Sequence, residues 1–279
     1  MHKILITTIC ALGVGMTASA YAGNGQHGPK YHEHGRSPMG FVRQLDLSAE
    51  QRKAMRETLV QHRTGFETMR DAMREQAQAL AELDSQAPEY AARVEAFADR
   101  ASNLARQRVD GMAQLRGELW AILTPEQRSK QLAMVAELAD RTPGRIEKRL
   151  REHGEERFER MAQDLELSDE QRTQVEGLLT QFRDKSAPTR AAMRGEFMEL
   201  LAMNPETADY SSRVQAAADV AARSAYIRAR DLAGLQGELA SVLTPQQREA
   251  LMARMSQGGR RHHDGEPRGD RRQAPEALG

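Results

Sequence analysis

The chain has 279 residues, and its 40 basic and 40 acidic side chains give a formal net charge of zero. This balance argues against a nucleic-acid binder that depends on bulk positive charge. With only 10 prolines and few β-branched residues, a sandwich, a barrel or a parallel-sheet enzyme is not expected. Ala, Glu, Lys, Leu and Arg make up nearly half of the sequence, which is typical of long helices. We therefore predict an all-α protein.

The first 22 residues have the layout of a cleaved secretory signal peptide. Lys3 is followed by an apolar run over 4–16 and by the small residues Ala20 and Ala22, which flank Tyr21 in an Ala-x-Ala pattern. The single cysteine, Cys10, lies in this run, so the mature chain would have neither disulfides nor thiol chemistry. No later segment reaches the roughly 18 apolar residues of a membrane span. We expect a periplasmic protein without stable membrane insertion, with an uncleaved anchor as the alternative.

Histidines gather in the two expected tails, 23–38 and 258–279. They are His27, His32 and His34 in the first, and His262 and His263 beside Asp264 in the second. Imidazole and carboxylate groups are acceptable ligands for zinc or another transition metal. Neither tail has the spacing of an ordered metal site, however. Two interpretations stay open, a metal site at the first three histidines and a polar, flexible, disordered tail.

An internal repeat organises the rest of the chain. The segment 45–52 recurs at 165–172, and 123–128 recurs at 243–248, in both cases 120 positions later. We predict two copies of one helical unit, 39–140 and 158–257, joined by a connector at 141–157.

Each repeated motif predicts the start of a helix. A serine or threonine stands at the cap position and a glutamine follows three residues later, which is the capping-box arrangement. Pro125 and Pro245 occupy the first helical position, where a missing N–H costs nothing. The cap and glutamine pairs are Ser48 and Gln51, Thr124 and Gln127, Ser168 and Gln171, and Thr244 and Gln247.

The apolar residues between these motifs predict an antiparallel helical hairpin. They recur in steps of three and four from Met55 to Leu83 and from Val94 to Ile122, with a break near 84–88. A short helix from Thr124 closes the unit. The second copy has Pro188 where the first has Thr68, so its long helix is expected to bend there.

Arginines form a stripe of their own on the first helix, at Arg52, Arg56, Arg63, Arg70 and Arg74. One interpretation is a solvated face with ordinary ion pairs. The other is a surface that binds unfolded, acidic or amphipathic chains loosely, because methionines on the neighbouring seam repack easily.

The paired Leu-Ser/Thr-x-x-Gln motifs, which flank a helical hairpin after an export signal, resemble the Spy/CpxP family. The resemblance implies a periplasmic, ATP-independent chaperone that holds unfolded or aggregation-prone envelope proteins during stress, in a cradle of paired four-helix units. It also implies client-binding residues at the matching positions, which are Leu45, Leu47, Arg56, Arg63, Leu165, Leu167 and Arg183. Glu176, which stands 120 positions after Arg56, departs from this pattern because it is acidic. The alternative is a regulatory adaptor or metal-binding sensor that acts on the periplasmic domain of a sensor kinase.

Fusion of two copies suggests that one chain replaces a homodimer. A covalent link raises the effective concentration of each half around the other, so the halves can pair within the chain. We expect a monomer with this internal pseudo-dimer, or else a dimer. The sequence has no phosphate-binding glycine loop, no His-Glu-x-x-His pair and no cysteine beyond Cys10, and no enzyme is expected. No cofactor beyond a possible metal is implied.

Overall fold

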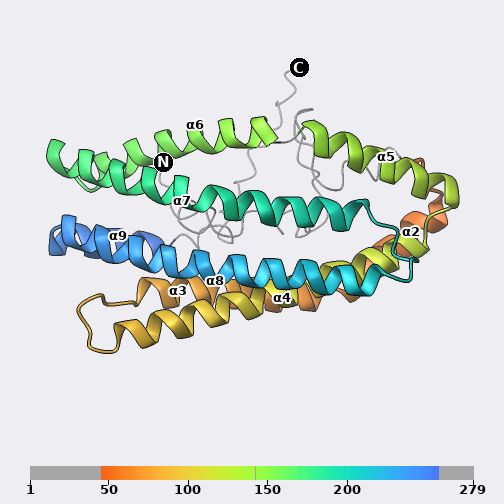
Figure 1. Cartoon of the computed structure of the whole chain (residues 1–279), viewed down its shortest axis with the longest axis horizontal. Coiled ribbons are helices and arrows are strands. Elements are labelled where there is room, and N and C mark those ends of the chain that lie inside the picture. The colour runs from red at the N-terminus through yellow and green to blue at the C-terminus, as the bar shows by residue number, and fades with distance from the viewer. Residues whose placement is uncertain (1–44, 142, 258–279) are drawn as a thin grey trace, which may run out of the picture.

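A computed structural model describes residues 45–141 and 143–257 of the chain. Within these ranges the backbone forms eight helices and no strand (Figure 1). The helices are α2 (Ala49–Gln61), α3 (Arg63–Ala81), α4 (Tyr90–Ala121), α5 (Pro125–Arg141), α6 (Pro143–Asp164), α7 (Asp169–Ala202), α8 (Tyr210–Val242) and α9 (Pro245–Gln257). None of the helices described is long and apolar enough to cross a membrane. The all-α prediction is confirmed.

The four predicted capping motifs all begin helices. In α2, the hydroxyl of Ser48 accepts from the backbone N–H of Gln51 at 3.1 Å, and the Gln51 side chain accepts from the N–H of Ser48 at 3.0 Å. Ser168 and Gln171 repeat this arrangement at α7. The same reciprocal bonds join cap and glutamine at the proline-initiated helices α5 and α9. The two copies therefore share their helix boundaries at these motifs.

The glutamines also join the two motifs of each unit. The side-chain amide of Gln51 donates to the Oε1 of Gln127 at 2.7 Å and to the carbonyl of Ile122 at 2.9 Å. Gln127 donates in return to the Oε1 of Gln51 and to the carbonyl of Leu45, both at 3.1 Å. We call this reciprocal pair the glutamine clasp. Gln171 and Gln247 form the second clasp, which is why each motif needs an amide that both donates and accepts.

The first long helix is interrupted, and the second is not. In the first unit α2 ends and α3 begins at His62, whose Nε2 lies 2.8 Å from the Oε2 of Glu118 on α4. In the second unit α7 is continuous, with Phe182 buried at the position equivalent to His62. Gly65 in the first turn of α3 weakens that helix further, because glycine is a poor helix former. The first unit is thus interrupted at His62. In the second unit, α7 remains helical through Pro188, the position of the expected bend.

The expected connector, 141–157, is itself helical where it is described. It contributes the end of α5 and most of α6. Phe158, Met161 and Ala162 on α6 pack into the core of the second unit, together with Leu165 and Val175. The connector therefore continues as helix into the second unit, and the residues of α6 that pack into that unit's core lie after it, at 158–162.

The two units pack on each other within the chain through α4 and α8, which run antiparallel (Figure 1). Tyr90 donates through its hydroxyl to the carbonyl of Ala233 at 2.8 Å, and its repeat counterpart Tyr210 donates to the carbonyl of Ala113 at 3.3 Å. These two bonds are related by the 120-residue repeat in both partners, so the pairing has a pseudo-two-fold axis. Alanines such as the fully buried Ala98 and Ala233 let the two helices approach closely.

The outer helices cross between the units. The short helix α5 of the first unit packs on α7 of the second, and α9 of the second packs on α3 of the first. Each unit therefore covers part of the long helix of the other. This crossed packing forms an internal pseudo-dimer in a single chain.

Candidate functional site

The basic residues expected to bind clients lie around an exposed apolar residue on α2 and the start of α3. Arg56 and Arg63 are both exposed, and Val60 between them is 69% exposed, more than any other large hydrophobic residue in the described ranges. Spacings of four and three residues put the three side chains on one helical face, since His62 keeps a right-handed helical conformation. We call Arg56, Val60 and Arg63 the α2 face.

The second unit lacks this arrangement. Glu176 occupies the position equivalent to Arg56, and the half-buried Thr180 occupies that of Val60. Arg183, the counterpart of Arg63, is half-buried and lies 3.6 Å from the carboxylate of Asp184. Of the expected basic residues, Arg56 and Arg63 thus share one face in the first unit, whereas Arg183 has no such neighbour in the second.

The four leucines of the expected client surface lie in the hydrophobic cores. Leu45 is 2% exposed and Leu47 7% exposed, in the core that Met55 and Leu123 complete in the first unit. Leu165 and Leu167 are buried in the second core. In this conformation the four leucines are not on the surface. The positions before each capping box are part of the core at the end of each helical pair. Contact between these leucines and a client would require that end to open.

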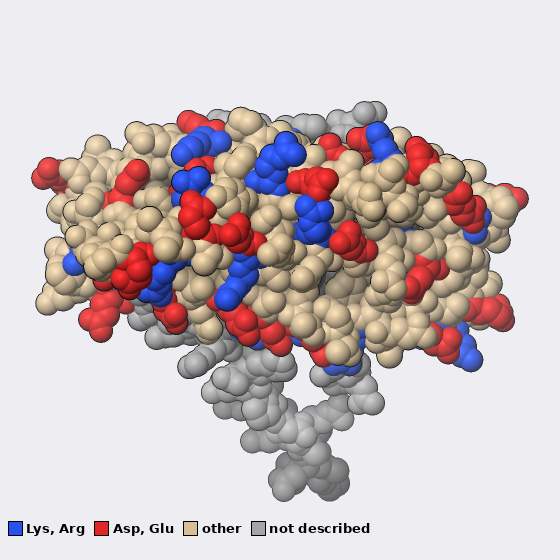
Figure 2. All heavy atoms as spheres, turned by 60° about the horizontal axis from the view of Figure 1, so that its bottom comes forward, with Lys and Arg blue, Asp and Glu red and all other residues tan. Residues whose placement is uncertain are grey.

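The surface carries charges of both signs. Figure 2 shows basic and acidic side chains interspersed over the face that includes α3 and α4, with broad areas that are neither. Several arginines of the predicted stripe are engaged nearby. Arg63 donates to Glu67 at 2.8 Å, Arg74 donates to Asp71 at 2.8 Å, and Arg52 donates to the carbonyl of Leu47. Two arginines of the stripe, Arg63 and Arg74, therefore have acidic partners on their own helix.

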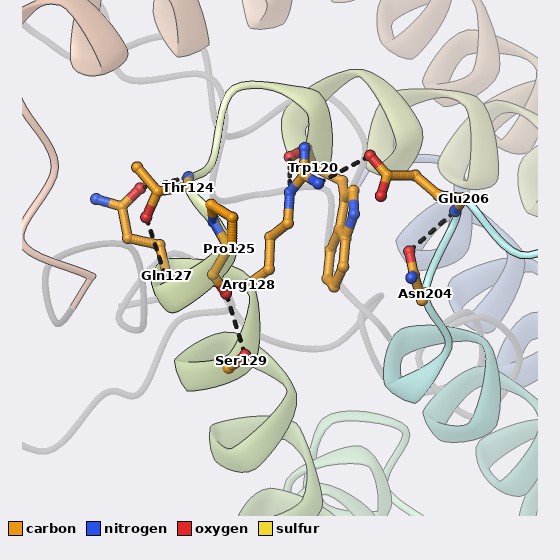
Figure 3. A network of polar contacts seen from close by, with 8 residues as sticks. All are labelled: Trp120, Thr124, Pro125, Gln127, Arg128, Ser129, Asn204 and Glu206. Carbon is orange, nitrogen blue, oxygen red and sulfur yellow. Dashed lines mark hydrogen bonds and ion pairs between the residues drawn. The ribbon is translucent and has the colours of Figure 1, made fainter.

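At one end of the pseudo-dimer two arginines lie near the ring of Trp120, and Figure 3 shows one of them, Arg128. The guanidinium carbons of Arg116 and Arg128 lie 5.4 and 5.5 Å from the ring centre of Trp120. Arg128 also donates to the carbonyl of Trp120 at 3.1 Å and forms an ion pair with Glu206 of the second unit at 2.8 Å. Arg116 donates to the carbonyl of Met203 in the same α7–α8 loop at 2.7 Å, and burial lowers its pKa. Sequence reasoning missed this contact between the units.

The histidines proposed as metal ligands, His27, His32 and His34, lie outside the described residues. So do His262 and His263. Within 45–141 and 143–257 there is no cluster of three or more His, Cys, Asp or Glu side chains that could hold a metal ion. The metal hypothesis therefore rests on the sequence of the tails.

This architecture is that of two helical-hairpin units, each opened by capping boxes and joined by a clasp. Residues 5–130 match the family described as heavy-metal resistance, and residues 153–255 match the family described as LTXXQ motif family protein. Both are Spy/CpxP-type families, and the two matches lie in tandem along the chain. These families are non-enzymatic. Comparisons with curated proteins and with solved structures found no match.

Proposed function

We propose that this protein is a periplasmic chaperone that holds unfolded or aggregation-prone envelope proteins without ATP and without catalysing a reaction. The match of both halves to Spy/CpxP-type families supports this proposal and the periplasmic location. The observation that carries it is the α2 face, where an exposed aliphatic side chain stands between two exposed guanidinium groups. Such a surface offers apolar contact and charge without demanding a fixed geometry from its partner.

The pseudo-dimer would act as a preassembled holder. Because the two units pair within one chain, holding activity should not depend on the concentration of a second molecule. Light scattering after size-exclusion chromatography should give one chain per particle at micromolar concentration. An obligate dimer would overturn the single-chain holder.

An aggregation assay tests the function itself. An equimolar amount of the protein should slow the light scattering of a reduced or heated client in buffer that contains no nucleotide. If aggregation proceeds at the same rate as with an inert protein of equal mass, the chaperone proposal fails.

Charge reversal tests the α2 face. The double variant Arg56→Glu and Arg63→Glu should reduce client protection severalfold while far-ultraviolet circular dichroism is unchanged, because both side chains are exposed. The matched control is Arg93→Glu with Arg223→Glu, which makes the same change in net charge at exposed positions of α4 and α8. Adding Arg183→Glu should weaken protection little further, since this residue lies apart from an exposed apolar partner. Equal loss in the control would show that net charge alone matters.

A metal-linked regulatory role is the second candidate. The family matched by residues 5–130 is described as heavy-metal resistance, and that range includes His27, His32 and His34. Calorimetric titration with zinc should show binding that replacement of these three histidines by alanine removes. Tight zinc binding without protection from aggregation would favour a sensor or an adaptor for a sensor kinase.

A further inference from the structure

A buried arginine lies between α7 and α8 of the second unit. Arg228 on α8 is only 6% exposed, and its guanidinium carbon lies 6.0 Å from the ring centre of Phe182 on α7. Burial, and to a smaller extent the nearby charge of Arg190, lowers the pKa of Arg228 to about 10. Arginine is almost never fully buried unless its charge is paired. A negatively charged partner is therefore expected beside the guanidinium group of Arg228.

Two donors of Arg228 have no hydrogen-bond acceptor among the described residues. They are Nε and Nη2, and both atoms are shielded from solvent. Their N–H bonds point in parallel from one edge of the planar guanidinium, the edge that pairs with two oxygens of a single carboxylate, phosphate or sulfate. A buried donor without an acceptor destabilises the folded state. Both donors of one bidentate edge are thus available together.

The surrounding charges are mainly positive. Arg190 contributes to the field at Arg228, as does the carboxylate of Asp231 with the opposite sign. That carboxylate, however, is already paired with Lys185 at 2.8 Å. Arg183, the residue after Phe182, has Asp184 as its neighbour. At the Nε–Nη2 edge of Arg228 itself, no side chain of the described residues accepts a hydrogen bond.

Pro188 lies in the same part of α7 as these groups. Proline cannot donate to the carbonyl of residue 184, and its ring disturbs the preceding turn of α7. Side chains supply donors in that turn, since Arg190 donates to the carbonyl of Arg183 at 3.0 Å and Ser186 donates to that of Phe182 at 2.7 Å. The first unit has Thr68 at the position of Pro188, and α3 there is a separate helix.

We propose that the second unit holds a small oxyanion of the phosphate or sulfate type at Arg228, between α7 and α8. The Nε and Nη2 groups of Arg228 would bind two of its oxygens, and the positive field of Arg190 would add to the attraction. Because Arg228 is only 6% exposed, the proposed occupant is a small ion and not a lipid surface or a polymer. This site is independent of the α2 face and of the proposed chaperone activity.

Thermal unfolding in inorganic phosphate, compared with sodium chloride of equal ionic strength, tests the site. At ten times its dissociation constant, phosphate should raise the Tm of the full chain by about 3–5 °C. Arg228→Met should abolish this increment. The matched control is Arg108→Met, the counterpart on α4, which should retain it. Sulfate in place of phosphate should act similarly, whereas acetate, with a single carboxylate and less charge, should act more weakly.

Direct binding keeps the proposal falsifiable if Arg228→Met does not fold. Calorimetric titration of the unaltered protein with phosphate should show one site per chain, and Arg190→Gln should weaken it severalfold. Absence of binding, or an equal loss in Arg108→Met and Arg228→Met, would overturn the proposal.

Discussion

The two ends of the pseudo-dimer are built on the same backbone plan but closed by different side chains. At one end Arg116 and Arg128 lie near the ring of Trp120, and Arg128 pairs with Glu206 across the units. The equivalent positions at the other end are Ala240, Gln236, Arg248 and Gln86. Gln236 still donates to the carbonyl of Leu83 and Arg248 to that of Ala240, so the backbone contacts survive. The two ends therefore share these bonds to backbone carbonyls, and one end adds the contacts of Trp120 and the ion pair with Glu206.

The largest effect is expected from Trp120→Ala, which gives the first end the residue of the second. Trp120 is 3% exposed, and removal of a buried aromatic side chain costs about 3–5 kcal/mol. Urea unfolding followed by circular dichroism measures the change in the free energy of unfolding. Ala240→Ser is the control and should cost well under 1 kcal/mol. A comparably small cost for Trp120→Ala would mean that the tryptophan does not stabilise the first end.

The glutamine clasps should respond equally at both ends. Gln127→Ala and Gln247→Ala each remove a reciprocal side-chain pair and the bonds to a backbone cap, for an expected loss of about 1–3 kcal/mol. Adding Gln51→Ala to Gln127→Ala should cost less than the sum of the single losses, because both residues share one network. Urea unfolding of the unaltered protein, of Gln51→Ala, of Gln127→Ala and of the double variant gives this coupling energy. Strictly additive losses would contradict the clasp.

The ion pair between the units offers a smaller and reversible change. Glu206→Gln should cost about 0.5 kcal/mol, since Glu206 is 55% exposed and exposed pairs contribute little. Conversely, Gln86→Glu should create the missing pair with Arg248 and gain a similar amount. Both effects should shrink in 1 M salt by screening. Emission of Trp120, the one tryptophan in the sequence, should shift in Glu206→Gln and stay constant in Gln86→Glu.

The weakest effect concerns pH at the helix interruption. The hydrogen bond with His62 lowers the pKa of Glu118 below its usual value near 4.5. A lowered pKa stabilises the folded state above the unfolded-state value, and this contribution disappears as pH falls through the lowered value. Thermal unfolding should therefore lose a small increment below about pH 4.5, and Glu118→Gln should lack it. Glu238→Gln on α8 is the control, with Phe182 rather than histidine opposite.

Much of the frame could be predicted because it depends on local chemistry. Serine, threonine, proline and glutamine at fixed spacing determine where helices begin, and the 120-residue offset predicts that the second unit copies the first. Pairing of the units within the chain also followed from the repeat. The clasp was missed, although the signal was present, because an amide at all four motifs can bond beyond its own cap.

The side-chain site was harder to predict because it depends on which face packs. The leucines before the capping boxes were expected to contact clients, yet the chain turns there at Asp46 and Glu166, both with φ of 50°, and buries them. Arg108, the counterpart of Arg228, lies in the predicted apolar pattern from Val94 to Ile122. An arginine at such a position indicates a buried charge. Val60 stood in no predicted seam, and its exposure became evident only in three dimensions.

Covalent linkage of the two units also changes what a single mutation can do. In a symmetric homodimer every substitution appears twice, once in each subunit, so both extremities must accept it. Here a substitution alters one extremity alone. The indole of Trp120 lies beside one loop without a second indole at the other, and Arg228 on α8 can be replaced while Arg108 on α4 is unchanged. The two units of the chain can thus differ in their side chains, and in what those side chains do, while they keep the same backbone plan.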